Sequence, residues 1–170
     1  MEIQKRLWIW IVFLGACARL VPHPWNFTPI MAIGLFAGYQ GRKASTGVLT
    51  TLLALALSDA VMGFYRGFWY VYAAALIPVF LGWLIRNRSS AGAIAAAALA
   101  SSLSFFFITN FMFWATSLWY PHTVAGLSAC FLGAIPFYQN QILGDAFYTA
   151  AIFGGYAALS RYCQPVRQAA

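Results

Sequence analysis

The chain has few charged residues and almost no acids. Of its 170 residues only 8% are charged, whereas about a quarter are charged in a typical soluble domain. Ten Lys and Arg stand against three Asp and Glu, and the basic residues form short clusters between apolar runs. Membrane proteins set their orientation in this way, so we expect no nucleic-acid partner. At 62% hydrophobic, the chain predicts a single integral membrane domain over residues 1–170, with the lipid bilayer as its surroundings.

Motifs for catalysis, cofactors and metals are also missing. The chain contains no G-x-S-x-G, H-E-x-x-H or P-loop pattern. Its three cysteines, Cys17, Cys130 and Cys163, form no C-x-x-C pair and lie in or beside apolar runs. They are predicted to be buried small apolar residues rather than a redox or metal site. We therefore expect no cofactor and no bound metal.

Apolar runs dominate what is present. They predict an all-α polytopic membrane protein with six transmembrane helices. The predicted helices cover about residues 7–21, 28–40, 45–62, 68–84, 91–115 and 142–159. Thr28 is the predicted N-cap of the second helix, with Pro29 at its first position. The apolar stretch 123–137 is shorter and is interrupted at Pro136, which predicts a half-helix in the outer leaflet before the last helix. If this stretch crosses the membrane, the count becomes seven.

The basic residues predict the orientation of these helices. With six helices, one side of the membrane receives eight Lys and Arg and the other side receives two. The first group is Lys5, Arg6, Arg42, Lys43, Arg86, Arg88, Arg161 and Arg167, and the second is Arg19 and Arg66. The positive-inside rule then places both termini in the cytoplasm. The expected location is a bacterial inner or plasma membrane. A seventh helix moves the C-terminal arginines outside, so six helices are preferred.

Most of the remaining polar residues fall on the opposite, outer side. Ionisable groups at membrane depth are costly and usually face a cavity or one another, so we expect these residues to form an outward-facing pocket. The predicted substrate-binding residues are His23, Trp25, Asn26, Asp59, Tyr65, Asn110, Trp114, Asn140 and Asp145. Structural alternatives remain open: an interfacial belt for the tryptophans, an ion pair between Asp59 and Arg66, and a helix-start position for Asp145.

The loop between the first two helices is predicted to form one wall of that pocket. At 1.5 Å per residue the two predicted helices are only ~22 Å and ~20 Å long, against ~30 Å of hydrocarbon. The stretch "PHPWN" is therefore expected to lie beneath the outer surface and to be mostly buried. Its two prolines stiffen the loop. Trp25 offers a face for a ring, and His23 and Asn26 offer hydrogen bonds.

Three further stretches carry a resemblance to a known family. They are "LLALALSDAVMGFY", "FFFITNFMFW" and "GAIPFYQNQILGDAFYTAAIFGGY". Together with six helices and an outward pocket, they resemble the S component, the substrate-binding subunit, of energy-coupling factor (ECF) transporters. The stretch "ARLVPHPWNFTPIMAIGLFAG" also resembles an uncharacterised bacterial membrane family close to these S components.

The resemblance implies uptake of a small vitamin-like or nucleobase-like solute. It also implies an ECF module, made of two ATPases and a transmembrane scaffold subunit, that drives release of the solute inside. S components usually present an Ala-x-x-x-Ala pattern on the first helix to the scaffold. This chain has Gly15, Ala16 and Ala18 there without that spacing, and Gly34 and Gly38 on the second helix are the expected substitute.

Two other functions compete with solute binding. Asp59 and Asp145 are a candidate carboxylate pair of an intramembrane enzyme, although "GD" at 144–145 is only half of the aspartyl protease G-x-G-D pattern. A small channel or structural membrane protein is the other alternative. The candidate pocket residues supply rings, amides and charges of both signs, which favours a neutral or zwitterionic aromatic solute. We expect the chain not to be an enzyme.

Overall fold

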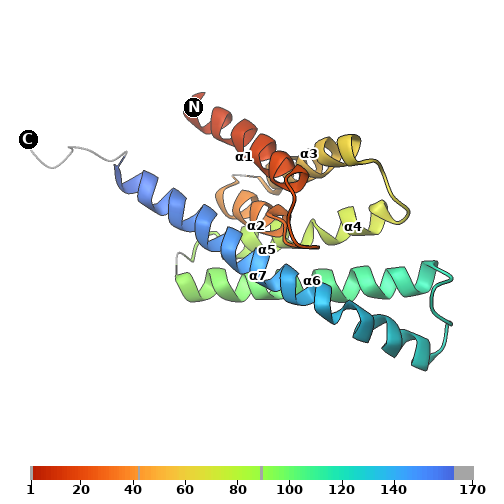
Figure 1. Cartoon of the computed structure of the whole chain (residues 1–170). Coiled ribbons are helices and arrows are strands. Elements are labelled where there is room, and N and C mark those ends of the chain that lie inside the picture. Colours follow the sequence, from red (N-terminus) through yellow and green to blue (C-terminus); the bar gives the residue numbers. More distant parts are fainter. Residues whose placement is uncertain (1, 42, 89, 163–170) are drawn as a thin grey trace, which may run out of the picture.

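The structure, a computed structural model, describes the backbone of residues 2–41, 43–88 and 90–162 and, within these ranges, the side chains of residues 10–160. Every regular element in these ranges is a helix (Figure 1). The helices are α1 (Glu2–Leu20), α2 (Ile30–Gln40), α3 (Ala44–Met62), α4 (Phe68–Ala74), α5 (Ile77–Ile85), α6 (Ala91–Thr116) and α7 (Val124–Tyr162). The all-α prediction is thereby confirmed for the described part of the chain.

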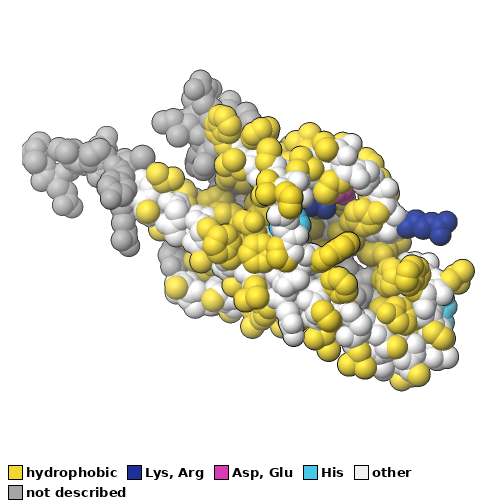
Figure 2. Space-filling model, in the orientation of Figure 1, with side chains coloured by type: hydrophobic (Ala, Val, Ile, Leu, Met, Phe, Trp, Pro, Cys, Tyr) yellow, Lys and Arg dark blue, Asp and Glu magenta, His cyan; other side chains and the backbone are white. Residues whose placement is uncertain are grey.

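Within the described residues, four segments are long and apolar enough to cross a membrane. They are Ala44–Met62, Phe68–Ile85, Ala91–Thr116 and Val124–Ser160, and α2 is a shorter apolar helix. The second segment joins α4 and α5, which are interrupted just before Pro78 because proline has no N–H to continue the helical ladder. The surface in Figure 2 is covered mainly by hydrophobic side chains with few charged ones. Such a surface suits lipid rather than water.

The last helix differs from the prediction. α7 is one helix of 39 residues that continues through Pro136, so the separate half-helix over 123–137 is wrong. Proline removes only one backbone donor, and in apolar helices neighbouring groups can satisfy the carbonyl that this frees. At 1.5 Å per residue α7 is ~58 Å long, about twice the hydrocarbon thickness. Figure 1 shows it running obliquely across the other helices.

The first two helices also begin at other residues than predicted. α1 begins at Glu2 rather than at residue 7, and α2 begins at Ile30 with Pro29 in the N-cap position and no capping side chain. The predicted Thr28 cap is therefore wrong. Asn26 adopts a left-handed conformation (φ 64°), and the N–H of Thr28 donates to the Asn26 carbonyl at 3.0 Å. This local turn occupies the chain just before the helix.

α2 lies at the centre of the bundle. Its residues from Ile30 to Gly38 are all buried, and it packs against α1, α3, α5, α6 and α7. Small residues permit this approach: a Cβ atom on Gly38 would lie 1.9 Å from the Val79 carbonyl oxygen of α5, and one on Gly34 would lie 3.4 Å from the Pro78 side chain. Gly34 and Gly38 therefore face the interior, which corrects the expectation that they present a surface to a scaffold subunit.

The helices alternate in direction, so the loops divide between two ends of the bundle. The start of α1 and the end of α7 lie toward one end in Figure 1, and the α3–α4 and α6–α7 turns lie at the other. The connections at the terminal end carry the described basic residues Lys43, Arg86 and Arg88. Several residues used in the sequence predictions lie outside the described side chains: Lys5, Arg6, Arg42, Arg161, Cys163 and Arg167.

Candidate functional site

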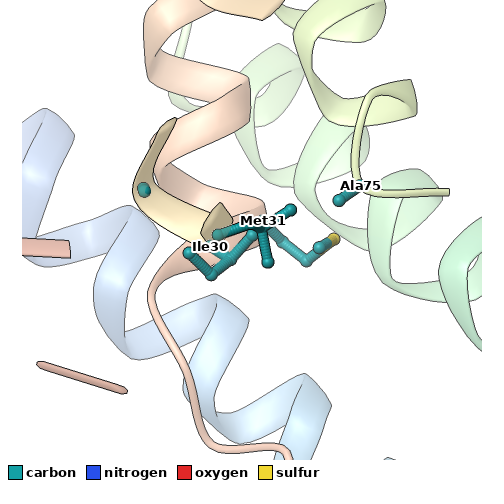
Figure 3. Packing of buried hydrophobic residues seen from close by; sticks show 5 residues of the cluster. Ile30, Met31 and Ala75 are labelled. Atoms are coloured by element: carbon teal, nitrogen blue, oxygen red, sulfur yellow. The ribbon is translucent and has the colours of Figure 1, made fainter. Parts of the chain in front are cut away.

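A cavity of about 760 Å³ opens among the loops at the end opposite the termini. We call it the loop-side cavity. Part of its wall is the hydrophobic core cluster around Ile30, Met31 and Ala75, where Figure 3 shows the Met31 side chain extending toward Ala75. Small-molecule pockets commonly enclose about 300–1,000 Å³, so this cavity has room for a molecule of that kind.

Six of the nine predicted binding residues line the loop-side cavity. They are His23, Trp25, Asn26, Tyr65, Asn110 and Asp145. Asp59, Trp114 and Asn140 are not among its lining residues. The prediction also left out polar residues that do line the cavity, namely Arg19, Thr28, Thr109 and Gln141. The structure thus brings most of the predicted set to one place, from four different elements or loops.

Asp59 lies behind the cavity wall in a buried ion pair. It has no exposed surface, and its Oδ1 lies 2.8 Å from Nη1 of Arg19, whose side chain is 12% exposed. Arg19 also donates to the Ser58 hydroxyl, and the Tyr72 hydroxyl donates to Asp59 Oδ2 at 2.8 Å. The predicted pair with Arg66 is wrong, since Arg66 is exposed. The sequence offered two outer arginines, and only the packing of α1 on α3 selects between them.

Asp145 lies in the middle of α7 and is 3% exposed. Its predicted position at a helix start is wrong because α7 begins 21 residues earlier, at Val124. Ser102 and Gln141 are its polar neighbours. Nε2 of Gln141 donates to the Ser102 carbonyl at 2.9 Å and to the Ser102 hydroxyl at 3.1 Å. Asp145 Oδ2 has no hydrogen-bond partner among the described residues.

The α1–α2 loop forms the rim of the cavity. Trp25 is 76% exposed, Pro22, Pro24 and Asn26 are exposed, and His23 is half-buried. The prediction that "PHPWN" is mostly buried is therefore wrong. That prediction rested on the shortness of the first two helices. α1 gains its extra residues at its start, from Glu2, and α2 has only 11 residues, so helix length does not decide whether the loop is covered by other parts of the protein.

Phe27 anchors this loop to α7 beside Asp145. Its ring lies 6.0 Å from that of Phe147 and 5.5 Å from that of Tyr148, centroid to centroid. A Cβ atom on Gly144 would lie 3.0 Å from the Phe27 Cα. The glycine before Asp145 therefore makes room for the loop, which explains the "GD" pair by packing.

Trp114 and His122 instead organise the α6–α7 turn. Nε1 of Trp114 donates to the Pro121 carbonyl at 2.9 Å, and Nε2 of His122 lies 2.9 Å from the Trp114 carbonyl oxygen. Their rings meet edge to face at 5.4 Å. Trp114 is thus engaged with the turn rather than with the cavity, and His122 lies in the turn itself. Asn140 is half-buried on α7.

Tyr65 and Asn110 offer hydrogen bonds from the cavity wall. Burial, together with the negative charge of Asp59, raises the pKa of Tyr65 to about 12, so its phenol stays protonated and able to donate at neutral pH. The Asn110 amide nitrogen donates to the Phe106 carbonyl at 2.7 Å. The Asn110 amide oxygen remains as an acceptor for a ligand.

Cysteines and metal-ligand clusters add no further site in the part of the chain that is described. Cys17 and Cys130 are free thiols, half-buried and buried respectively. No group of three His, Cys, Asp or Glu lies together among these residues. The polar chemistry of the region is therefore that of the loop-side cavity and the ion pair behind it.

Comparison with known proteins gave one match. The profile of a family of unknown function, DUF6580, matches residues 1–167, which is nearly the whole chain. No curated protein and no solved structure matches the chain.

Proposed function

We propose that this chain, which belongs to the family of unknown function DUF6580, is a membrane protein that binds a small solute. In this proposal it captures a vitamin-like or nucleobase-like compound from the outer side, as the substrate-binding subunit of an ECF-type uptake transporter. The observation that carries the proposal is the loop-side cavity of about 760 Å³, which gathers hydrogen-bonding side chains from separate elements.

The chemistry of the cavity wall supports a solute with a ring. Apolar and aromatic side chains make up much of the lining, including Tyr65, Tyr70, Phe105 and Phe113. A few polar groups stand among them, with Asn110 on α6 and Gln141 on α7. An apolar pocket with a small number of placed polar groups is the usual form of a small-molecule site. Aromatic faces add favourable stacking geometry for rings.

The proposed topology has six crossings, with both termini cytoplasmic in a bacterial inner or plasma membrane. The crossings are α1, α2, α3, the α4–α5 segment, α6 and α7. α1 begins and α7 ends toward the same end of the bundle (Figure 1), which supports an even number of crossings. The eight-to-two distribution of Lys and Arg supports the orientation. The loop-side cavity then faces outward.

Coupling to an ECF module of two ATPases and a scaffold subunit is proposed from the sequence resemblance. Since Gly34 and Gly38 are packed inside against α5, the contact with a scaffold subunit must use another face. The competing proposal of an intramembrane enzyme has less support. Asp59 is bonded to Arg19 and Tyr72, and only Asp145 of the two acids lines the cavity.

Native mass spectrometry of the protein, released gently from detergent, tests the proposal. We expect an adduct with the mass of a small solute, which disappears on collisional activation and can be identified after extraction. A protein that carries no solute, and that no compound in a vitamin and nucleobase library stabilises against heat, overturns the proposal in favour of a channel or structural role.

A further inference from the structure

We propose that Asp145 is the counter-charge for a positively charged nitrogen of the solute, so that the loop-side cavity prefers amines and cationic rings over carboxylates. This inference rests on the proposed function and names the solute class for the same cavity.

The charges on the cavity wall do not balance. Arg19 and Asp145 are the Arg and Asp residues that line it. The charge of Arg19 is already matched by Asp59 at 2.8 Å. In the described part of the chain, Arg19 and Asp59 form an ion pair, and no cation lies within ion-pair distance of Asp145. His23, the other ionisable nitrogen on the wall, directs Nδ1 to the Pro24 carbonyl oxygen at 2.8 Å. One carboxyl group is therefore left for a ligand.

The carboxyl group of Asp145 is buried, and one of its two oxygens, Oδ2, has no hydrogen-bond partner among the described residues. The group is 3% exposed, and burial without a cation or donors is costly. Ser102 and Gln141 are polar neighbours of the carboxyl group, and the Gln141 amide nitrogen also donates to Ser102. One turn further along α7, Oγ1 of Thr149 is also buried without a partner. Thr149 does not line the loop-side cavity, so Asp145 Oδ2 is the buried acceptor that an ammonium or amidinium group in this cavity would meet.

The position of Asp145 also orients the solute. It lines the loop-side cavity and, in addition, a second cavity of about 470 Å³ between α6 and α7 that includes Ala91 and Gly154. No other described residue lines both. Asp145 thus stands at the inner limit of the loop-side cavity, while Trp25 stands at its rim. A cationic nitrogen on Asp145 leaves the ring of the solute directed toward the aromatic side chains of the mouth.

Three probes of similar shape test the charge preference: benzylammonium, benzyl alcohol and benzoate. The full-length protein is purified in detergent, freed of retained solute, and its thermal unfolding midpoint is measured by tryptophan fluorescence with each probe. We expect benzylammonium to raise the midpoint most. In Asp145→Asn, which keeps the shape and removes the charge, we expect its affinity to fall about tenfold or more, since hydrogen bonds to charged groups are the strong ones.

A second variant removes the excess negative charge of the site. Asp59→Asn removes the partner of Arg19, so an unmatched cation then faces the cavity beside Asp145. We expect this variant to gain stabilisation by benzoate that the natural protein lacks. If either variant fails to fold, the ranking of the three probes on the natural protein decides.

Each other result overturns the inference. Stabilisation by benzoate equal to that by benzylammonium excludes a preference for cations, as does an undiminished benzylammonium response in Asp145→Asn. Sodium chloride, but not choline chloride, could instead raise the unfolding midpoint in a way that depends on Asp145 while benzylammonium has no effect. That result assigns Asp145 to an inorganic cation. An anionic compound recovered by mass spectrometry overturns this inference but leaves solute binding intact, whereas the absence of any bound compound overturns the proposed function.

Discussion

Arg19 on α1 and Asp59 on α3, 40 residues apart in the sequence, form an ion pair with 2.8 Å between Nη1 and Oδ1. Tyr72, from α4, donates a hydrogen bond to the same carboxylate. The pair therefore joins three helices at the edge of the loop-side cavity. One partner reaches the cavity wall and the other is fully buried.

Separating this pair is expected to destabilise the protein. Arg19→Met leaves the Asp59 carboxylate buried and unmatched, which costs about 3–5 kcal/mol when one member of a buried pair is removed. Asp59→Asn is expected to cost less, because Arg19 can reach water in the cavity. The double variant should be more stable than the sum of the single effects predicts. Reversible unfolding in detergent measures the coupling, and strictly additive losses count against a direct pair.

The close contact of α2 with α5 gives a second expectation. Gly38→Ala directs a methyl group at the Val79 carbonyl oxygen, 1.9 Å from the new Cβ, and overpacking of this kind costs about 1–3 kcal/mol. Gly155→Ala on α7 is the matched control, because nothing lies within 4 Å of its Cβ position. The control should be neutral or slightly stabilising, since alanine favours helix more than glycine. Equal unfolding midpoints for the two variants refute the α2–α5 packing.

The rim position of the α1–α2 loop can be tested by labelling. In a background without native cysteines, Trp25→Cys should react readily with a membrane-impermeant maleimide added outside the cell, because Trp25 is 76% exposed. Leu35→Cys, at a fully buried position of α2, is the unreactive control. Addition of the bound solute should slow labelling at position 25. Labelling there only after the membrane is permeabilised places the loop on the wrong side.

The six-crossing topology makes its own prediction. A reporter that is active only in the cytoplasm, fused after Ala170, should be active, and one that is active only after export should not. The reason is the excess of Lys and Arg on the terminal side. The opposite pattern requires an odd number of crossings and places the C-terminus outside.

Much of the helical framework follows from the sequence. α3 and α6 begin and end within one residue of their predicted limits, because each is a long apolar run with polar or turn residues at both ends. Ser90 additionally caps α6, accepting a hydrogen bond from the Ala93 N–H at 3.2 Å. Pro136 misled the prediction of α7, since a helix can continue through a proline when neighbouring groups or a local adjustment of the helix satisfy the carbonyl that the proline frees.

The site was less predictable than the helices. Alternation of the helices places His23, Tyr65 and Asn110 at one end, which the sequence could indicate. Which of those residues turn inward depends on packing: Trp114 is taken up by the α6–α7 turn, and Asp59 by Arg19. No spacing in the sequence indicates that Asp59 pairs with an arginine 40 residues away. The burial of the loop was inferred from helix length, which does not determine whether neighbouring elements cover a loop, and Trp25 proved 76% exposed.

The affinity of the recovered solute for two matched asparagine variants tests the central claim most directly. Asn110 lines the loop-side cavity and Asn140 does not, although both are half-buried. We expect Asn110→Ala to raise the dissociation constant about tenfold, the scale of one lost hydrogen bond, while Asn140→Ala leaves it unchanged and neither variant loses its fold. A solute that binds equally well to Asn110→Ala, or that is weakened by Asn140→Ala instead, contradicts the assignment of this cavity as the binding site.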